Sequence, residues 1–248
     1  MLKDGRKSNH ILDALPPDER ERLVAHLEEV AMPLGAVIHE TGASQTYVYF
    51  PIDCVVSLLY VLENGNTAEV AIIGDDGIVG MPVITGGSKS PYRAIVQAGG
   101  IAFRMLARDL RAEFERAQAA QQILLRYSQA LMMQIGQTAV CNRHHSVDQQ
   151  LCRWLLMSID RLPDNNLNMT QELIANMLGV RREGVTEAAG KLQESGAIRY
   201  ARGRIFVLDR GQLERACCEC YEVVRKEYER LLPWDTKARA IRLAARDP

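Results

Sequence analysis

Residues 168–192 read NMTQELIANMLGVRREGVTEAAGKL, and the organisation of the whole chain follows from this stretch. Thr170 suits a helix N-cap, because its hydroxyl can accept a hydrogen bond from a free N–H of the first turn. Apolar residues recur at helical spacing up to Gly179, where a sharp turn favours a residue that tolerates positive φ. The apolar pattern restarts at Val180 and continues to Leu192. The stretch therefore predicts two helices joined by a tight turn.

The polar face of the second predicted helix carries residue types that contact DNA. Arg can form a bidentate pair with guanine, and Glu can accept a hydrogen bond from cytosine N4. A helix that exposes such residues at its N-terminal end fits the major groove. The alternative is an ordinary helical hairpin with solvated charges. The candidate DNA-binding residues in this stretch are Thr170, Arg181, Arg182, Glu183, Thr186, Glu187 and Lys191.

A predicted β-hairpin follows the two helices. Residues 198–200 and 205–208 are short β-prone runs, and residues 201–204 form a turn between them. Arg202 and Arg204 fall near the tip of this wing, where they are well placed to meet phosphates. The wing therefore favours DNA binding over the simple hairpin.

Length and composition limit the remaining choices. The 248 residues allow one large or two medium domains, and 47% hydrophobic with 25% charged residues predicts substantial cores. A net charge of −1 argues against a globally basic coat, although DNA binding requires only that the contacted phosphates be neutralised. No apolar run approaches the roughly 18 residues that span a membrane, and the N-terminus has no apolar signal core. We expect a cytoplasmic protein that does not bind membranes.

The first half of the chain predicts a small barrel or jelly roll. Short helices are expected between Asn9 and Val30, and glycines then punctuate a series of β-prone runs. Asn64-Gly65 is a strong hairpin signal, and Gly99-Gly100 predicts another hairpin. The clearest predicted strands cover residues 47–50, 55–61, 68–73, 94–98 and 101–105.

A long helix is predicted from Gln118 to about Cys141, and further helices over residues 146–162 and 211–232. The long helix has an apolar row that needs a cover. A second copy of the chain is the favoured cover, because readers of duplex DNA generally dimerise to match a two-fold site. The alternative is that the row packs on its own barrel. The candidate dimer-interface residues are Leu124, Tyr127, Leu131, Ile135 and Thr138.

Six cysteines in a cytoplasmic protein are expected to be thiols rather than disulfides. Three of them lie close together in Cys217-Cys218-Glu219-Cys220. Two intervening residues are the usual spacing for one tetrahedral ion, so this spacing is poor for chelation. Helix packing is the favoured role and metal or redox chemistry the alternative, and we predict no metal ligands.

The order of barrel, long helix and winged helix-turn-helix resembles the Crp/Fnr superfamily of bacterial transcription regulators. The resemblance covers about Asn9 to Tyr228, and its order and spacing are more specific than any single motif. Residues 153–156 (RWLL) and Cys220-Tyr221 also look like one branch of the family. The other segments that carry the resemblance are residues 12–16 (LDALP), 49–51 (YFP), 74–81 (GDDGIVGM) and 170–192.

The resemblance implies an α+β fold with an N-terminal β-roll or jelly-roll sensor domain. It also implies a homodimer that binds a palindromic operator in double-stranded DNA, with RNA polymerase as a further partner. By position, Arg182, Glu183 and Glu187 fall where the family reads bases, with Arg181 and Thr186 beside them. The implied divisions are a β-roll over 1–117, a dimerisation helix and hinge over 118–145, a winged helix-turn-helix over 146–232 and a tail over 233–248.

The effector is not identified by the resemblance. In the cyclic-nucleotide branch a Gly-Glu pair holds the ribose, but Ile78 follows Gly77 here and cannot accept hydrogen bonds from hydroxyls. The later Arg-Ser pair is also incomplete, because no Ser follows Arg93. Cyclic-nucleotide binding in the usual mode is therefore disfavoured. The candidate effector-pocket residues are Gly77, Ile78, Val79, Gly80, Tyr92, Arg93 and Tyr127.

Other functions fit the sequence less well. An N-terminal iron–sulfur cluster is excluded, because no cysteine precedes Cys54. A cyclic-nucleotide-type regulatory module that does not act on DNA would have no use for the winged helix-turn-helix. The sequence has no nucleophile elbow, zinc-protease motif or Walker loop, so we expect no catalytic residues and no enzymatic activity.

Overall fold

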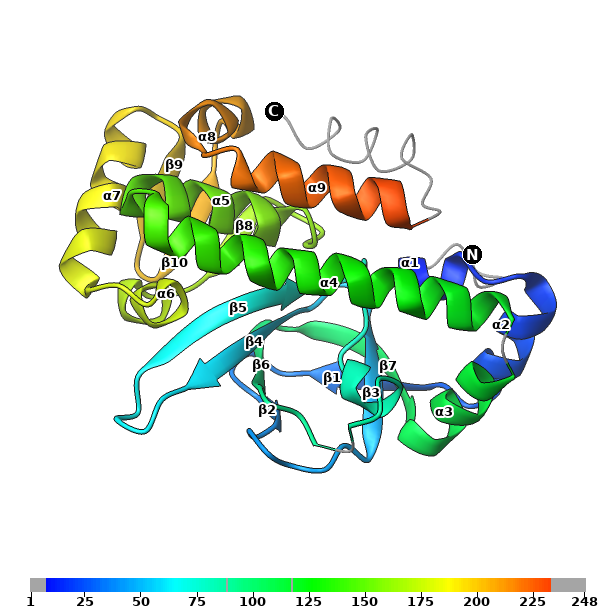
Figure 1. Ribbon diagram of the computed structural model, residues 1–248. Coiled ribbons are helices and arrows are strands. Elements are labelled where there is room, and N and C mark those ends of the chain that lie inside the picture. The colour runs from blue at the N-terminus through cyan, green and yellow to red at the C-terminus, as the bar shows by residue number, and fades with distance from the viewer. Residues whose placement is uncertain (1–7, 88, 117, 233–248) are drawn as a thin grey trace.

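The N-terminal half of the chain forms a two-sheet β-roll, which lies below the long helix α4 in Figure 1. The computed structural model describes residues 8–87, 89–116 and 118–232. Two short helices, α1 (His10–Asp13) and α2 (Pro17–Val24), precede the roll. Asn9 caps α1 through a hydrogen bond from Ile11 N (3.0 Å), and Pro17 opens α2 at a position where its missing N–H costs nothing.

All strands of the β-roll pair in antiparallel fashion. A short 3₁₀ turn, η1 (Met81–Val83), lies between the fifth and sixth strands. The larger sheet has the order β2 (Val37–His39), β6 (Arg93–Ala98), β4 (Val55–Val61) and β5 (Thr67–Ile73). The smaller sheet has the order β1 (Glu28–Met32), β7 (Gly100–Leu106) and β3 (Tyr47–Pro51).

The hairpin predicted at Asn64-Gly65 is confirmed. Gly65 has φ 83°, and the turn joins the paired strands β4 and β5. The hairpin predicted at Gly99-Gly100 is wrong, because β6 and β7 belong to different sheets. A Cβ on Gly100 would lie 2.4 Å from Asp53 Oδ1, so glycine there permits close approach of the Asp53 segment as the chain changes sheet.

Two helix predictions need correction. The helices expected to reach Val30 end at Val24, and Val30 belongs to β1. The single helix predicted over residues 211–232 is two helices, α8 (Arg210–Ala216) and α9 (Cys220–Leu231). Cys217 is extended, with φ −76° and ψ 157°, and it turns the chain between them.

The predicted long helix is confirmed as α4 (Ala119–His144), which follows α3 (Ala107–Glu115). Figure 1 shows α4 crossing the molecule between the β-roll and α9. Gln134, in the middle of α4, accepts a hydrogen bond from Ile72 N (3.1 Å) and donates to Ile72 O (3.2 Å). Its amide also donates to the Tyr228 hydroxyl at 2.9 Å. This buried amide therefore ties α4 to both the edge strand β5 and α9.

The C-terminal part begins at α5 (Val147–Ile159), whose N-terminus has a capping box between Ser146 and Gln149. Its small sheet has the order β8 (Asn166–Asn168), β10 (Arg204–Val207) and β9 (Ile198–Ala201). No strand was predicted at β8, which is a three-residue strand paired to β10. The predicted tail over 233–248 lies outside the described residues. None of the helices in the described ranges is both long and apolar enough to cross a membrane.

The C-terminal part packs directly on the β-roll through buried polar contacts. Gln97 of β6 accepts a hydrogen bond from Ser57 (2.8 Å) and donates to Ser158 of α5 (3.0 Å). Arg161, just after α5, places Nη2 2.7 Å from Asp76 Oδ2 and donates from Nε to Oδ1 at 3.0 Å. Both partners of this ion pair are almost fully buried. The Gln97 contact links β6 to α5, and the Arg161–Asp76 pair links the 74–80 loop to the end of α5.

Glu69 of β5 lies buried at the same junction, and we expect it to make stability depend on pH. Burial raises the pKa of Glu69 to about 7, despite Ser57 and the positive charge of Arg153, which lower it. The folded state thus holds this proton more tightly than the unfolded state. The contribution of Glu69 to the free energy of unfolding should be fully present below about pH 4.5. About 3 kcal/mol of it should be lost as the pH rises through 7.

Urea unfolding at about pH 5 and about pH 8 checks this prediction, since the midpoint reports stability at unchanged slope. Glu69→Gln should flatten the difference between the two pH values. Glu63→Gln, at an exposed position of the neighbouring hairpin, is the control and should behave like the unmodified chain. An unchanged pH dependence in Glu69→Gln would show that this carboxyl is not the titrating group.

Candidate DNA-binding face

The predicted helix-turn-helix is present as α6 (Gln171–Leu178) and α7 (Arg182–Glu194). The Thr170 hydroxyl accepts a hydrogen bond from Leu173 N at 3.3 Å, which confirms the predicted N-cap. Gly179 has φ 66° and ends α6 in the left-handed conformation that the tight turn needs. The inner face of α7 is buried through Val185, Ala188, Ala189 and Leu192. The opposite face of α7 therefore has to point outward.

The nine residues predicted to contact DNA are all exposed. Arg181 is the N-cap of α7, so Arg182 and Glu183 occupy its first turn. Lys191 Nζ lies 2.9 Å from Glu187 Oε1 and 3.1 Å from Asp148 Oδ2. Hydrogen bonding to Glu187, and then to Asp148, raises the pKa of Lys191. The C-terminal half of this face is therefore neutralised within the chain, whereas Arg181 and Arg182 form no ion pair shorter than 4 Å among the described residues.

The predicted wing is β9 and β10, joined by a tight turn. Arg202 and Gly203 both have positive φ, 52° and 72°. Gly203 O accepts a hydrogen bond from Met169 N at 2.8 Å, which holds the wing tip against the start of α6. Arg202 and Arg204 extend from this fixed turn into solvent. Two guanidinium groups thus lie beside the helix-turn-helix.

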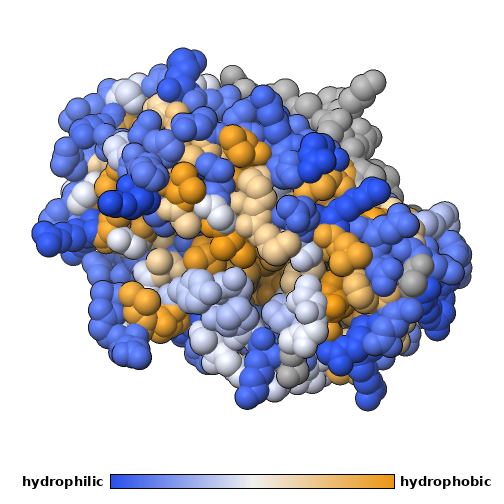
Figure 2. All heavy atoms as spheres, viewed as in Figure 1, coloured by the Kyte–Doolittle hydropathy of each residue, from blue (hydrophilic) through white to orange (hydrophobic). Residues whose placement is uncertain are grey.

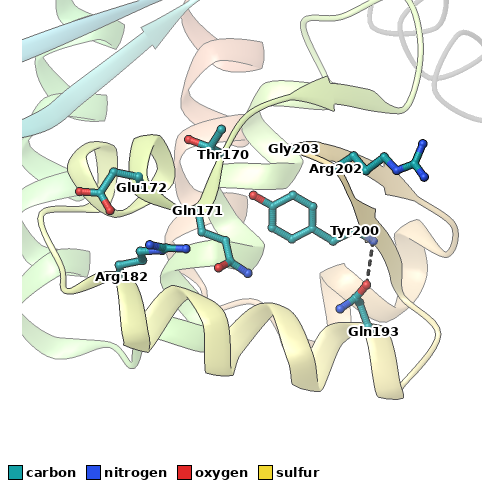
Figure 3. A pocket seen from close by; sticks show the side chains of 8 residues that line it. All are labelled: Thr170, Gln171, Glu172, Arg182, Gln193, Tyr200, Arg202 and Gly203. Carbon is teal, nitrogen blue, oxygen red and sulfur yellow. Dashed lines mark hydrogen bonds between the residues drawn. The ribbon is translucent and has the colours of Figure 1, made fainter.

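A cavity of about 500 Å³ separates the wing from the helix-turn-helix (Figure 3). Tyr200 N–H donates to Gln193 Oε1 (2.9 Å), and the Tyr200 hydroxyl donates to Met169 O (2.8 Å). Figure 3 shows the Gln171 side chain pointing between the two walls. The lining residues are Thr170, Gln171, Glu172, Arg182, Gln193, Tyr200, Arg202 and Gly203.

Gln171, Gln193 and Tyr200 were not among the predicted contacts. Amides and hydroxyls of this kind bond to phosphate oxygens, so the cavity suits a DNA backbone strand between α7 and the wing. One signal could have identified Gln171, because it directly follows the N-cap Thr170 and so opens the helix beside the wing. Gln193 and Tyr200 become neighbours only when β9 folds back along α7.

Comparison with known proteins agrees with this geometry. Residues 149–216 match the model of the Crp-like helix-turn-helix domain. Residues 149–216 of the chain are thus a Crp-like helix-turn-helix domain. A search of the curated proteins gave no match. The alternative of a regulatory module that does not act on DNA is not favoured, because the matched segment is the winged helix-turn-helix itself.

Solved structures share the fold of this chain at low sequence identity. FixK2 from Bradyrhizobium japonicum is 15% identical with a TM-score of 0.64, covering 77% of this chain and 98% of that chain. A putative Crp/Fnr regulator from Eubacterium rectale is 18% identical with a TM-score of 0.61, covering 83% and 96%. The c-di-GMP-responsive regulator CLP from Xanthomonas campestris is 16% identical with a TM-score of 0.60, covering 77% and 99%.

The residues predicted to line an effector pocket lie in two places in the structure. Tyr127 of α4 is fully buried, and its hydroxyl donates to Ile78 O at 3.3 Å. A Cβ on Gly77 would lie 2.3 Å from the Tyr127 oxygen, so the ring rests directly on this loop. Tyr92 instead packs edge-on against Tyr60, with ring centroids 5.0 Å apart, and Arg93 Nε lies 3.3 Å from Glu40 Oε2. Gly77 and Ile78 thus contact Tyr127, whereas Tyr92 and Arg93 contact other residues.

The residues predicted for the dimer interface mostly face inward. Leu124, Tyr127, Leu131 and Thr138 are buried within the single chain, whereas Ile135 is partly exposed. This matches the alternative in which the apolar row packs on its own barrel. A different apolar row of α4 is open: Leu125, Met132 and Val140 are 51%, 57% and 49% exposed. Figure 2 shows hydrophobic residues, interrupted by polar ones, across the face that α4 crosses.

Proposed function

We propose that the regulator binds a palindromic operator as a homodimer, with α7 in the major groove and the wing on the flanking phosphates. The observation that carries this proposal is one continuous exposed surface formed by the outer face of α7, the cavity and the wing tip. Each of its parts has a DNA counterpart: base edges for the first turn of α7, and phosphates for the cavity amides and the wing guanidiniums. The family's base-reading positions at Arg182, Glu183 and Glu187 agree with this orientation.

Arg182→Ala tests the reading face. Arg182 is exposed in the first turn of α7 and needs no partner within the fold, so its loss should leave folding unchanged. We expect operator affinity to fall by about 1–3 kcal/mol, with relaxed preference at one base position of each half-site. Selection of binding sites from random duplexes, with the original and the altered chain, measures that preference. A site preference that survives intact would reject the assignment of Arg182.

Arg202→Asn is the matched control at the wing. Arg202 has φ 52°, and Asn tolerates this conformation better than Ala, so the turn should survive the change. Binding to all sequences should weaken alike, and the salt dependence of binding should fall by about one unit of slope. The two variants thus separate base reading from phosphate contact.

The exposed row of α4 supports dimerisation. Leu125, Met132 and Ala139 recur every seven residues, which is the spacing of a coiled-coil seam, and Val140 and Ile135 flank them. Pairing of two such rows covers apolar surface that a single chain leaves in water. It also sets two α7 helices on one side of a duplex, where productive half-site spacing is about 34 Å.

Regulation would pass from the β-roll to α5 through the 74–80 loop. Tyr127 of α4 contacts this loop at Ile78. Asp76, which belongs to the loop, pairs with Arg161 at the end of α5. A ligand shifts such an equilibrium only through different affinities for two arrangements. Calorimetry should show no micromolar binding of cyclic AMP, because Ile78 is fully buried and offers no acceptor for ribose hydroxyls. Contact with RNA polymerase stays a prediction from the resemblance, and the absence of enzymatic activity stays a prediction from the sequence motifs.

A further inference from the structure

Four side chains of metal-ligating type converge where α4 meets the turn between α8 and α9. They are Cys141 and His145 from the end of α4, and Cys218 and Cys220 from the turn, and their ligand atoms all lie within 4.8 Å of one another. Cys141 Sγ and Cys218 Sγ are 3.6 Å apart, and Cys220 Sγ lies 3.4 Å from His145 Nδ1. The three sulfurs are buried.

These separations agree with a tetrahedral zinc site. Zn–S bonds of about 2.3 Å and Zn–N bonds of about 2.0–2.1 Å place sulfurs about 3.8 Å apart and a sulfur about 3.6 Å from a nitrogen. Three cysteines and one histidine are also a donor set that structural zinc sites use. We propose that Cys141, His145, Cys218 and Cys220 bind one zinc ion that fastens the α8–α9 turn to the end of α4.

The groups around these donors support the proposal independently. Glu219 Oε2 lies 3.3 Å from His145 Nε2, so a carboxylate holds the ring nitrogen opposite the one that faces Cys220. A carboxylate on the outer nitrogen is the arrangement that orients zinc-binding histidines. Gln137 Nε2 donates to Cys220 Sγ at 3.1 Å, as expected for a sulfur that carries negative charge. Arg153, which is buried, donates to Thr138 one turn before Cys141 and brings positive charge toward the Cys141 sulfur.

The other roles for these cysteines fit less well. A disulfide needs sulfurs about 2.05 Å apart and would use two of the four donors, leaving His145 and its carboxylate without a purpose. Apolar packing fits poorly as well, because Cys141, Cys218 and Cys220 form a small cluster separate from the main core, and among the described residues only Cys217 packs against it as a partly buried apolar residue. The α8–α9 turn thus has few apolar contacts of its own at this point.

The position of the site gives it a consequence for the regulator. His145 is the C-cap of α4 and Ser146 is the N-cap of α5, so the ion would sit at the joint between the long helix and the DNA-binding part. A cavity of about 510 Å³, lined in part by Cys217, Cys218 and Glu219, leads from solvent to the cluster and provides an entry path. The effect of zinc on operator affinity rests on the proposed function, whereas zinc binding itself does not.

Metal analysis of the full chain, purified without a metal-binding tag, tests the proposal without DNA. We expect one zinc per chain by mass spectrometry. After zinc removal, cobalt(II) should give the intense visible bands of a tetrahedral site and thiolate charge-transfer bands. Cys141→Ser and His145→Ala should abolish stoichiometric zinc, and His145→Cys should restore it by supplying a fourth thiolate. Glu219→Gln, at an exposed position, should lower zinc affinity about tenfold without disturbing the fold.

Cys217→Ser is the matched control, because Cys217 adjoins the cluster but lies outside the four donors. It should bind zinc like the unmodified chain. The proposal is overturned if the full chain takes up no zinc or cobalt(II) at micromolar concentrations, or if Cys141→Ser keeps full zinc. An intact mass two hydrogens lower under non-reducing conditions, with Cys141 and Cys218 joined in one peptide, would assign a disulfide instead. Zinc binding with unaltered operator affinity after zinc removal would keep the site and reject only its role at the joint.

Discussion

Arg161→Ala is expected to lower the free energy of unfolding by about 3–5 kcal/mol, because it leaves the Asp76 carboxylate buried without its partner. Arg161 and Asp76 are almost fully buried, and the pair is joined through both guanidinium Nε and Nη2. Burial lowers the pKa of Arg161, but attraction to Asp76 more than offsets this and raises it, so Arg161 keeps its charge. Urea unfolding followed by circular dichroism measures the loss.

An exposed pair of similar geometry provides the control. Arg230 Nη2 lies 2.7 Å from Glu227 Oε1 on α9, and Arg230→Ala should leave the free energy of unfolding almost unchanged, because water screens this pair. The double variant Arg161→Ala/Asp76→Ala should be more stable than the sum of the single losses predicts, since no charge is then left unpaired. Additive losses would show that the two residues do not act as a pair.

The Arg161 pair also bears on regulation, because it joins two parts that the sequence keeps 85 residues apart. Gly74, at the start of the same loop, has room for no side chain: a Cβ there would lie 2.5 Å from Arg161 Cβ. The loop and the end of α5 are therefore fitted to each other closely, and a displacement of one has to move the other. Such a contact is a suitable route from the β-roll to the DNA-binding part.

Local signals predicted much of this fold. Thr170 and Gly179 marked the ends of α6 because a cap and a left-handed turn depend on neighbouring residues alone. Asn64-Gly65 predicted the β4–β5 hairpin for the same reason. The exposure of the residues predicted to contact DNA also follows from the sequence, since burial of Val185 and Leu192 turns the other face of α7 outward.

Features that depend on distant segments were missed. β8 is three residues long and exists because β10 pairs with it. The break at Cys217 has no glycine or proline to mark it, and the α9 turn it creates approaches α4 about 75 residues earlier in the chain. The spacing of Cys217 to Cys220 alone is poor for binding one metal ion. Sequence spacing could not show that Cys141 and His145 of α4 lie beside Cys218 and Cys220.

The face of α4 was misassigned for a related reason. Leu124 and Leu125 are adjacent and equally apolar, so the sequence offers two rows that each satisfy helical spacing. The β-roll and α9 decide between them by covering Leu124, Tyr127 and Leu131. Only the structure identifies the row that remains for a partner chain.

Met132→Glu is expected to convert the dimer to monomers and to reduce operator affinity by about 10²–10⁴-fold, because two linked half-site contacts become independent ones. Met132 is 57% exposed at the centre of the open row, so a Glu there is solvated in the monomer. In a dimer the same Glu would be buried against apolar residues of the second copy, next to its own symmetry mate, and the cost of that burial opposes association. Light scattering and sedimentation measure the oligomeric state, and operator titration measures the affinity.

Val223→Glu provides the matched control, because Val223 is an apolar residue 41% exposed on α9 and is not part of the α4 row. It introduces the same charge into an exposed helix face and should leave both dimerisation and operator affinity unchanged. A Met132→Glu chain that stays dimeric would place the interface elsewhere. A monomeric Met132→Glu chain that still binds the full operator at the original affinity would contradict paired reading of two half-sites, whichever surface joins the subunits.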